Sequence, residues 1–356
     1  MTKSNKANFN NTCNYNVFIK KFIILCFIAY IITIYIFNNF EQKSNIKEFD
    51  KIKYDIVIPV SIIDINKTLQ LKNIFKKFIK FDNMILISDT NSNFLYKKDS
   101  IKIINEDLLL PKINLIKIFI NLGINDTSRV GWYEQQFLKM EYSKICNNDY
   151  YLLWDSDTIP IKPVKMFDND KPIFDLKKEH HSPYFVTLNR LIPNLHFIKY
   201  SYISEHMLIK TEFMKRLIDS IENNYNLNGK KYWEKIILSI DKNEIIRSGF
   251  SEFETYGTFV DNYYSHAYTH RIWYSKRDMA KYYGDPNNLS ENDLNWLSKD
   301  YNAVTFEKWD LFNKDYIQFV TELRYQNLCR PRRFFKYFKR IIHKYKIYIL
   351  DKKNII

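Results

Sequence analysis

The chain has 356 residues, of which 46% are hydrophobic and only 6 are Gly, enough for one large domain or two small ones. Neither GxGxxG nor GxxxxGKS/T occurs, which removes the motif support for a dinucleotide-binding Rossmann domain or a P-loop nucleotidase. The net charge of +14 gathers at the two ends of the chain. The near-neutral body therefore argues against nucleic-acid binding, and the charged ends suit a membrane surface.

The N-terminal part predicts a membrane anchor over residues 17–40. Phe22–Phe37 is an uncharged apolar run, and Lys20 and Lys21 can reach the headgroups, so the segment can span a bilayer. No small-x-small cleavage site follows it, which favours an uncleaved anchor over a signal peptide. We expect a single-pass type II arrangement in a Golgi-like, bacterial inner or viral membrane. Residues 1–16 would form a cytoplasmic tail and residues 41–53 a charged stem.

Residues 54–329 are expected to form one α/β domain. Short apolar runs predict strands over 54–62, 84–88, 101–104 and 150–154, and helical spacing predicts helices over 66–80, 111–120 and 132–146. This alternation is typical of a mainly parallel sheet with helices on both faces. Further along, the pattern predicts strands over 185–188 and 207–209 and helices over 212–221 and 253–264.

Three acidic residues follow predicted strands directly: Asp89, Asp155 and Asp157. In open α/β sheets, ligands bind at the carboxyl ends of the strands. Asp155 and Asp157 are two positions apart at the end of YYLLW, so both side chains can approach one cation. Oxygen ligands of this kind suit Mn²⁺ or Mg²⁺ bridged to substrate phosphates. A solvated turn is the alternative for these residues.

Four segments together resemble the GT-A-fold glycosyltransferases of the DxD type, especially an incompletely characterised group with a Gly-Trp-Tyr-x-Gln-Gln segment. The segments are YYLLWDSDTIP (150–160), RVGWYEQQFLK (129–139), ISEHML (203–208) and SGFSEFETYG (248–257). The resemblance covers roughly residues 54–275. It implies a GT-A-like domain that moves a sugar from a UDP- or GDP-sugar to a glycan, glycolipid or glycoprotein acceptor, using Mn²⁺ or Mg²⁺.

The resemblance also implies roles for individual residues. Asp157 would be a direct metal ligand, and Asp155 would contact the ribose or the metal. The nucleotide would meet Gln135 and Lys139, which are four positions apart on one helix, together with Arg129 and Asp89. An ordinary polar helix face is the alternative for the helical residues.

The proton acceptor and the third metal ligand are expected in the C-terminal half. Glu252 and Glu254 are candidates for the general base that an inverting transferase needs. The alternative is a helix N-terminus capped by Ser251, with acids in its first turn. His270 is the candidate third metal ligand, with a surface histidine as the alternative. His206 either lines the acceptor site or is a core histidine.

The tail from 330 to 356 interleaves basic and aromatic residues. It predicts an amphipathic helix at a membrane interface, with RNA binding or packing back onto the domain as alternatives. Cys146 and Cys329 can pair in an oxidising compartment or remain buried thiols. The function predicted from these features is a membrane-anchored glycosyltransferase. The alternatives are an inactive carbohydrate-binding or scaffold protein of the same fold and a membrane-tethered nucleic-acid-binding protein.

Overall fold

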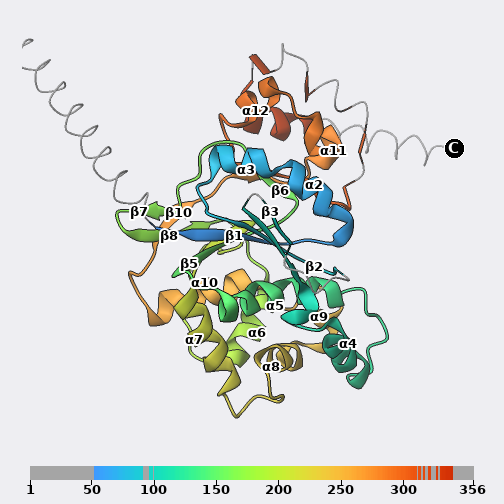
Figure 1. Cartoon of the computed structure of the whole chain (residues 1–356), viewed down its shortest axis with the longest axis vertical. Helices are drawn as coiled ribbons and strands as arrows, with labels where there is room; N and C mark the ends of the chain where they lie inside the picture. Colours follow the sequence, from blue (N-terminus) through green and yellow to red (C-terminus); the bar gives the residue numbers. More distant parts are fainter. Residues whose placement is uncertain are drawn as a thin grey trace, which may run out of the picture. The chain divides into compact units, whose positions relative to one another are not determined.

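The computed structural model describes residues 52–90, 96–98 and 100–310 and, beyond them, residues 312–313, 316, 320–321, 326–327 and 329–339. The predicted cytoplasmic tail, the membrane anchor and nearly all of the stem lie outside this part. Within it, no helix is both long and apolar enough to cross a membrane. The chain from Lys53 onward forms one compact unit (Figure 1).

The core of this unit is a six-stranded sheet in the order β3-β4-β2-β1-β5-β9. Strands β4, β2, β1 and β5 are parallel, and β3 and β9 run antiparallel at the two edges. The three central strands β2, β1 and β5 are almost entirely buried and mostly apolar, as expected for a sheet covered on both faces. The bounds of the six strands are Tyr54–Pro59 (β1), Met84–Ser88 (β2), Tyr96–Lys98 (β3), Ile101–Asn105 (β4), Tyr150–Trp154 (β5) and His206–Lys210 (β9).

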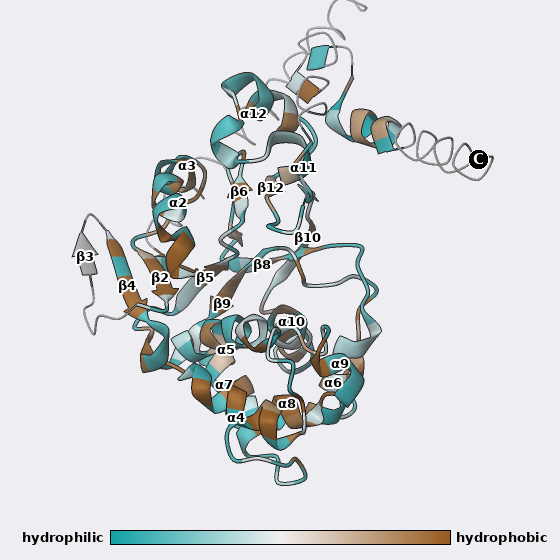
Figure 2. Cartoon of the chain, turned by 90° about the vertical axis from the view of Figure 1, so that its right-hand side faces the viewer, coloured by the Kyte–Doolittle hydropathy of each residue, from teal (hydrophilic) through white to brown (hydrophobic). Residues whose placement is uncertain are grey.

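Helices cover both faces of this sheet (Figure 1). On one face lie α2 (Ile65–Gln70) and α3 (Lys72–Phe78), and Phe75 of α3 packs edge-on against Trp154 at 5.7 Å between ring centroids. Figure 2 shows this helical layer and the sheet in a perpendicular view. The other face carries α4 (Lys112–Asn121), α5 (Val130–Ile145), α7 (Thr211–Glu222), α8 (Tyr232–Ser239) and α10 (Glu252–Tyr263).

Smaller elements complete the unit around this layered body. One three-stranded sheet contains β10 (Thr269–Ile272), β8 (Lys171–Leu176) and β7 (Phe167–Asp168), and another contains β11 (Ser275–Lys276), β12 (Ala303–Thr305) and β6 (Thr158–Pro160). Helix α6 (Ser182–Leu191) lies beside α8 in the second helical layer, and the remaining helices are the short η1 (Ile62–Asp64), η2 (Glu106–Leu108), α9 (Lys242–Ile245), α11 (Ala280–Tyr283), η3 (Pro286–Asn288) and α12 (Glu291–Leu297).

The expected α/β class is confirmed, and so are the strands expected over 54–62, 84–88, 101–104, 150–154 and 207–209, within a few residues at their ends. The strand expected over 185–188 is wrong, because these residues lie inside helix α6. Pro183 stands in the first turn of this helix, where backbone amides have no partner within the helix, so the missing N–H of proline costs no hydrogen bond. Leu188 and Leu191, three positions apart, are both buried, so the apolar spacing is that of a helix face.

The described part of the C-terminal tail packs onto the domain. Residues 331–339 are helical, and the side chains of Phe334, Phe335 and Phe338 are buried. Phe335 contacts Tyr282 and Trp296, with ring centroids 5.0 and 5.8 Å away. These rings are occupied within the protein, which favours the packing alternative over a membrane or RNA surface for residues 331–339. Cys146 and Cys329 are both free thiols.

Replacing Phe335 with Ala should destabilise the domain by about 3 kcal/mol, because it leaves a cavity among buried aromatic rings. Tyr337 is the matched control: it lies on the same helix but its side chain is 67% exposed, so Tyr337→Ala should change the free energy of unfolding by less than about 0.5 kcal/mol. Urea denaturation of both variants measures the difference. Equal effects of the two substitutions would contradict the packing of the tail.

Candidate active site

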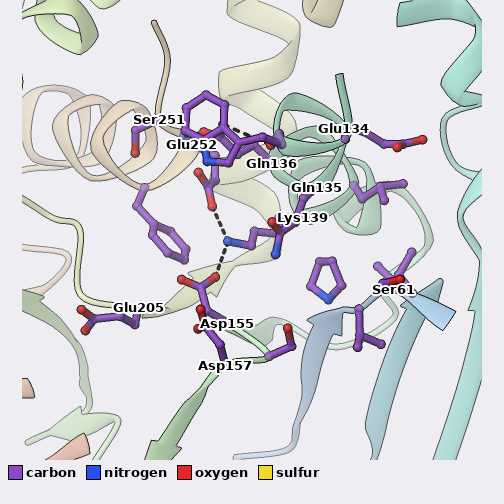
Figure 3. A pocket seen from close by; sticks show the side chains of 18 of the residues that line it. Ser61, Glu134, Gln135, Gln136, Lys139, Asp155, Asp157, Glu205, Ser251 and Glu252 are labelled. Atoms are coloured by element: carbon purple, nitrogen blue, oxygen red, sulfur yellow. Dashed lines mark hydrogen bonds and ion pairs between the residues drawn. The ribbon is translucent and has the colours of Figure 1, made fainter. Parts of the chain in front are cut away.

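A cavity of about 530 Å³ lies across the carboxyl ends of the four parallel strands. Each strand contributes a residue that follows it: Ser61 after β1, Asp89 after β2, Glu106 after β4 and Asp155 after β5. The edge of the sheet therefore delivers polar side chains to one place, as the position of these acids in the sequence predicts. Figure 3 shows the centre of this cavity.

The loop that carries the two aspartates is held by backbone hydrogen bonds. Thr158 N–H donates to the Asp155 carbonyl at 3.1 Å, which closes a turn over the two acids, and Asp155 N–H donates to the Glu205 carbonyl at 2.9 Å. Glu205 has a φ of 64°, a left-handed conformation that is costly for a residue with a side chain. The residue that holds the Asp155 backbone in place therefore has a strained backbone conformation itself.

Lys139 is the cation at the centre of the site. Its ammonium group donates to Asp155 Oδ1 at 2.7 Å and to Glu252 Oε1 at 2.6 Å, and its side chain is only 4% exposed. Burial acts to lower the pKa of Lys139, but Asp155 and Glu252 outweigh it and raise the pKa above its ordinary value. Lys139 therefore stays charged and connects α5, the end of β5 and the start of α10 (Figure 3).

Asp157, unlike Asp155 and Glu252, is not paired with Lys139. Its Oδ1 accepts a hydrogen bond from Thr158 Oγ1 at 3.2 Å, and no salt bridge joins it to another residue within the described ranges. Burial and the negative charge of Asp155 raise the pKa of Asp157 above its ordinary value. The two aspartates thus concentrate negative charge at one point of the cavity, where a cation would be stabilised.

The opposite end of the cavity is also acidic. Lys112 Nζ lies 2.6 Å from Glu134 Oε2 and 3.7 Å from Glu106 Oε1. Burial and the nearby Glu134 raise the pKa of Glu106 to about 7. Asp89 lines this end as well, and its Oδ1 accepts a hydrogen bond from Ile62 N–H at 2.9 Å. One lysine thus stands among three carboxylates there.

The sequence matches a family of unknown function, DUF6492, over residues 53–320. The chain belongs to this family. No curated protein matches it.

Solved structures similar to this DUF6492 chain include two glycosyltransferases. The apo-form of GlyE from Streptococcus pneumoniae TIGR4 is 12% identical with a TM-score of 0.32, and the match covers 82% of this chain and 64% of GlyE. This chain thus spans less than two thirds of the length of GlyE. The galactosyltransferase LgtC in complex with donor and acceptor sugar analogs is 9% identical with a TM-score of 0.37, and the match covers 76% of this chain and 94% of LgtC.

The structure brings six of the predicted residues of this DUF6492 protein to the cavity wall: Asp89, Gln135, Lys139, Asp155, Asp157 and Glu252. Arg129 is not among them. It lies at the N-terminal end of α5, and its guanidinium packs 5.5 Å from the Trp132 ring centroid. Arg129 therefore does not join Gln135 and Lys139 at the cavity wall.

Glu254 is also absent from the cavity wall. It is buried, and its Oε2 accepts hydrogen bonds from Ser201 Oγ at 2.7 Å and from Tyr202 N–H at 3.2 Å. Ser251 caps α10 by accepting from Glu254 N–H. The helix-N-terminus alternative therefore describes Glu254, and Glu252 alone of the pair faces the cavity.

His270 is not placed beside the aspartates. Its Nε2 lies 2.8 Å from Asp261 Oδ2, and the ring belongs to β10, whose residues do not line the cavity. His206 is a core histidine, with Nε2 2.9 Å from Asp175 Oδ2 and Nδ1 2.9 Å from the Ser204 carbonyl. Neither histidine is therefore retained as a residue of the cavity.

The charged residues of the cavity wall that sequence reasoning missed include Glu106, Lys112 and Glu134, which stand together at one end of it. Glu106 follows β4 directly, so the strand-end rule that identifies Asp89 applies to it equally. Glu134 lies inside the RVGWYEQQFLK segment, beside residues that were singled out. Lys112 had no signal in the sequence, because only the packing of α4 against α5 brings it to the site.

The pH dependence of stability should reveal Glu254. Burial raises its pKa from 4.5 to about 7, so the folded state retains a proton that the unfolded state has released between these values. Stability is therefore lost as the pH rises from 4.5 through 7. Glu254→Gln removes this loss. The free energy of unfolding of the variant, relative to that of wild type, should therefore rise by up to about 3 kcal/mol from pH 5 to pH 8. Urea titrations at both pH values measure the gain. A difference that does not change with pH would contradict this environment for Glu254.

Proposed function

We propose that this protein is a metal-dependent glycosyltransferase that takes a sugar from a nucleotide-diphosphate sugar. The observation that carries the proposal is the meeting of Asp155, Asp157 and the buried Lys139 in one cavity at the carboxyl ends of parallel strands. This combination offers a cation site and a fixed positive charge within a few ångströms. A diphosphate leaving group needs both, because negative charge develops on it as the glycosidic bond breaks.

The residues present fit Mn²⁺ or Mg²⁺. Asp155 and Asp157 offer carboxylate oxygens in the same cavity, where burial and then the charge of Asp155 raise the pKa of Asp157. Within the described residues, no group of three or more His, Cys, Asp or Glu is arranged to hold a metal. Two protein carboxylates are a usual complement for these ions when phosphates and water supply the other ligands. When bound, the ion would stabilise charge on the departing diphosphate.

The residues of the chain itself act around this point. Lys139 stays protonated, donates to Asp155 and Glu252 and lies 4.4 Å from the Phe253 ring centroid, so a fixed positive charge stands at the cavity wall where a phosphate would bind. Glu252 lines the cavity and remains the candidate that receives the proton of an acceptor hydroxyl. Its backbone N–H donates to Gln136 Oε1 at 3.1 Å, which fixes the start of α10. Closure of the cavity by the substrate would keep water from the reacting carbon.

The acceptor is proposed to be a glycan, a glycolipid or a glycoprotein next to a membrane. The apolar segment 17–40 and the charged stem 41–53 support this, because they would hold the domain beside the bilayer as a type II protein. The near-neutral body and the buried aromatic rings of residues 331–339 do not favour nucleic acid as the partner.

Asp157→Asn should lower Mn²⁺-dependent turnover of a nucleotide sugar by about 10²- to 10³-fold, because it weakens the group that stabilises charge on the leaving diphosphate. Asp168→Asn is the control: Asp168 is exposed on β7, outside the cavity, and this variant should retain wild-type turnover. Release of free nucleotide diphosphate, with and without Mn²⁺, is the measurement.

Two results would contradict this account. Unchanged turnover in a folded Asp157→Asn variant would remove the metal site from the reaction. Tight nucleotide binding without turnover on any nucleotide sugar would instead favour the inactive carbohydrate-binding alternative. Circular dichroism of the variant confirms that it is folded.

A further inference from the structure

The acidic end of the cavity, formed by Asp89, Glu106, Lys112 and Glu134, has a feature that no contact within the protein explains. The Glu134 side chain is 2% exposed, and its Oε2 is paired with Lys112. Its Oε1 is buried without a hydrogen-bond partner among the described residues. Burying an unpaired carboxylate oxygen costs stability, and Glu134 lines the cavity. A ligand N–H group would satisfy this oxygen.

The spacing of the strands indicates which part of a nucleotide reaches this end. Asp155 follows β5 and Glu106 follows β4, and the order β4-β2-β1-β5 separates these strands by three steps. At about 4.8 Å per step, the two ends of the cavity are roughly 14 Å apart. This is comparable to the distance from the phosphates to the base in an extended nucleoside diphosphate. Figure 3 accordingly shows Glu134 on the far side of Lys139 from Asp157.

A diphosphate bound at Asp155 and Asp157 therefore leaves its base beside Glu106, Lys112 and Glu134. Asp89 already accepts a hydrogen bond from Ile62 N–H, and the remaining two carboxylates and one ammonium group can recognise only some bases. Guanine presents two adjacent donors, N1–H and the 2-amino group, next to the acceptor O6. Uracil presents one N–H between two carbonyl oxygens, so a second carboxylate would face a carbonyl and repel it. Adenine and cytosine have an unprotonated ring nitrogen where guanine has N1–H.

We infer that the acidic end of the cavity binds guanine, so that the sugar donor of this protein is a GDP-sugar. Glu134 accepts a hydrogen bond from the 2-amino group, and Glu106 accepts one from N1–H. Lys112, whose ammonium lies 2.6 Å from Glu134 Oε2 and 3.7 Å from Glu106 Oε1, donates to O6. The inference rests on the proposed function, since it takes the diphosphate position from it, and it selects one of the two donor classes.

Nucleotide affinities test the inference directly. Titration calorimetry of the full chain with Mn²⁺ should give tighter binding for GDP than for UDP. Inosine diphosphate lacks only the 2-amino group, so it should bind roughly 10- to 100-fold more weakly than GDP. Equal affinities for GDP and inosine diphosphate, or a preference for UDP, would overturn the inference and leave the proposed function intact. Absence of binding by every nucleoside diphosphate would overturn both.

Substitution of Glu134 should change which base is preferred, which a purely structural role of this residue would not do. Glu134→Gln places an amide donor where the carboxylate stood, so it should weaken GDP binding and strengthen binding of xanthosine diphosphate, which has a carbonyl in place of the 2-amino group. Glu141→Gln is the matched control, because Glu141 is buried on the same helix, pairs with Lys144 and does not line the cavity. A Glu134→Gln variant that keeps the wild-type preference for GDP over xanthosine diphosphate would overturn the inference.

Discussion

A single buried ammonium group ties the site to the fold. Lys139 is held between Asp155 and Glu252 at 2.7 and 2.6 Å, so its charge joins a helix, a strand end and the start of a second helix. Removing one partner of a buried ion pair leaves an uncompensated charge, which costs more than the pair gains. The three elements must therefore keep their relative positions, and the aspartate loop is fixed to the sheet before any ligand arrives.

The charge of the cavity then decides which ligands it can accept. Carboxylates outnumber cations along its wall, where Lys112, Lys139, Arg277 and Lys308 stand against a larger set of acids. A bare diphosphate would be repelled at the aspartate pair, so the acids proposed to hold a divalent ion would make the binding of an anionic substrate conditional on that ion. At the far end the excess acid suits neutral N–H donors of a base instead. The acids of the cavity wall would thus select both the metal-bound diphosphate at one end and the base at the other.

The sequence predicts the parallel sheet and the acids at its edge, because both depend on local patterns: apolar runs for buried strands and acids directly after them. Lys139 and Glu252 are also predicted, but their pairing is not, since 113 positions separate them. The structure places Glu254 and His270 away from the cavity wall, for the same reason. Side-chain direction at the start of α10 and on β10 depends on Ser201, Tyr202 and Asp261, which lie far away in the sequence. Lys112 reaches the site only through helix packing.

The most direct test of the central claim is anomalous diffraction from crystals grown with Mn²⁺ and a nucleoside diphosphate. The account predicts one manganese peak in contact with the carboxylates of Asp155 and Asp157 and with the diphosphate, with the Lys139 ammonium still bound to Asp155. A nucleotide bound with its diphosphate away from both aspartates, or manganese held at another place in the chain, would contradict it.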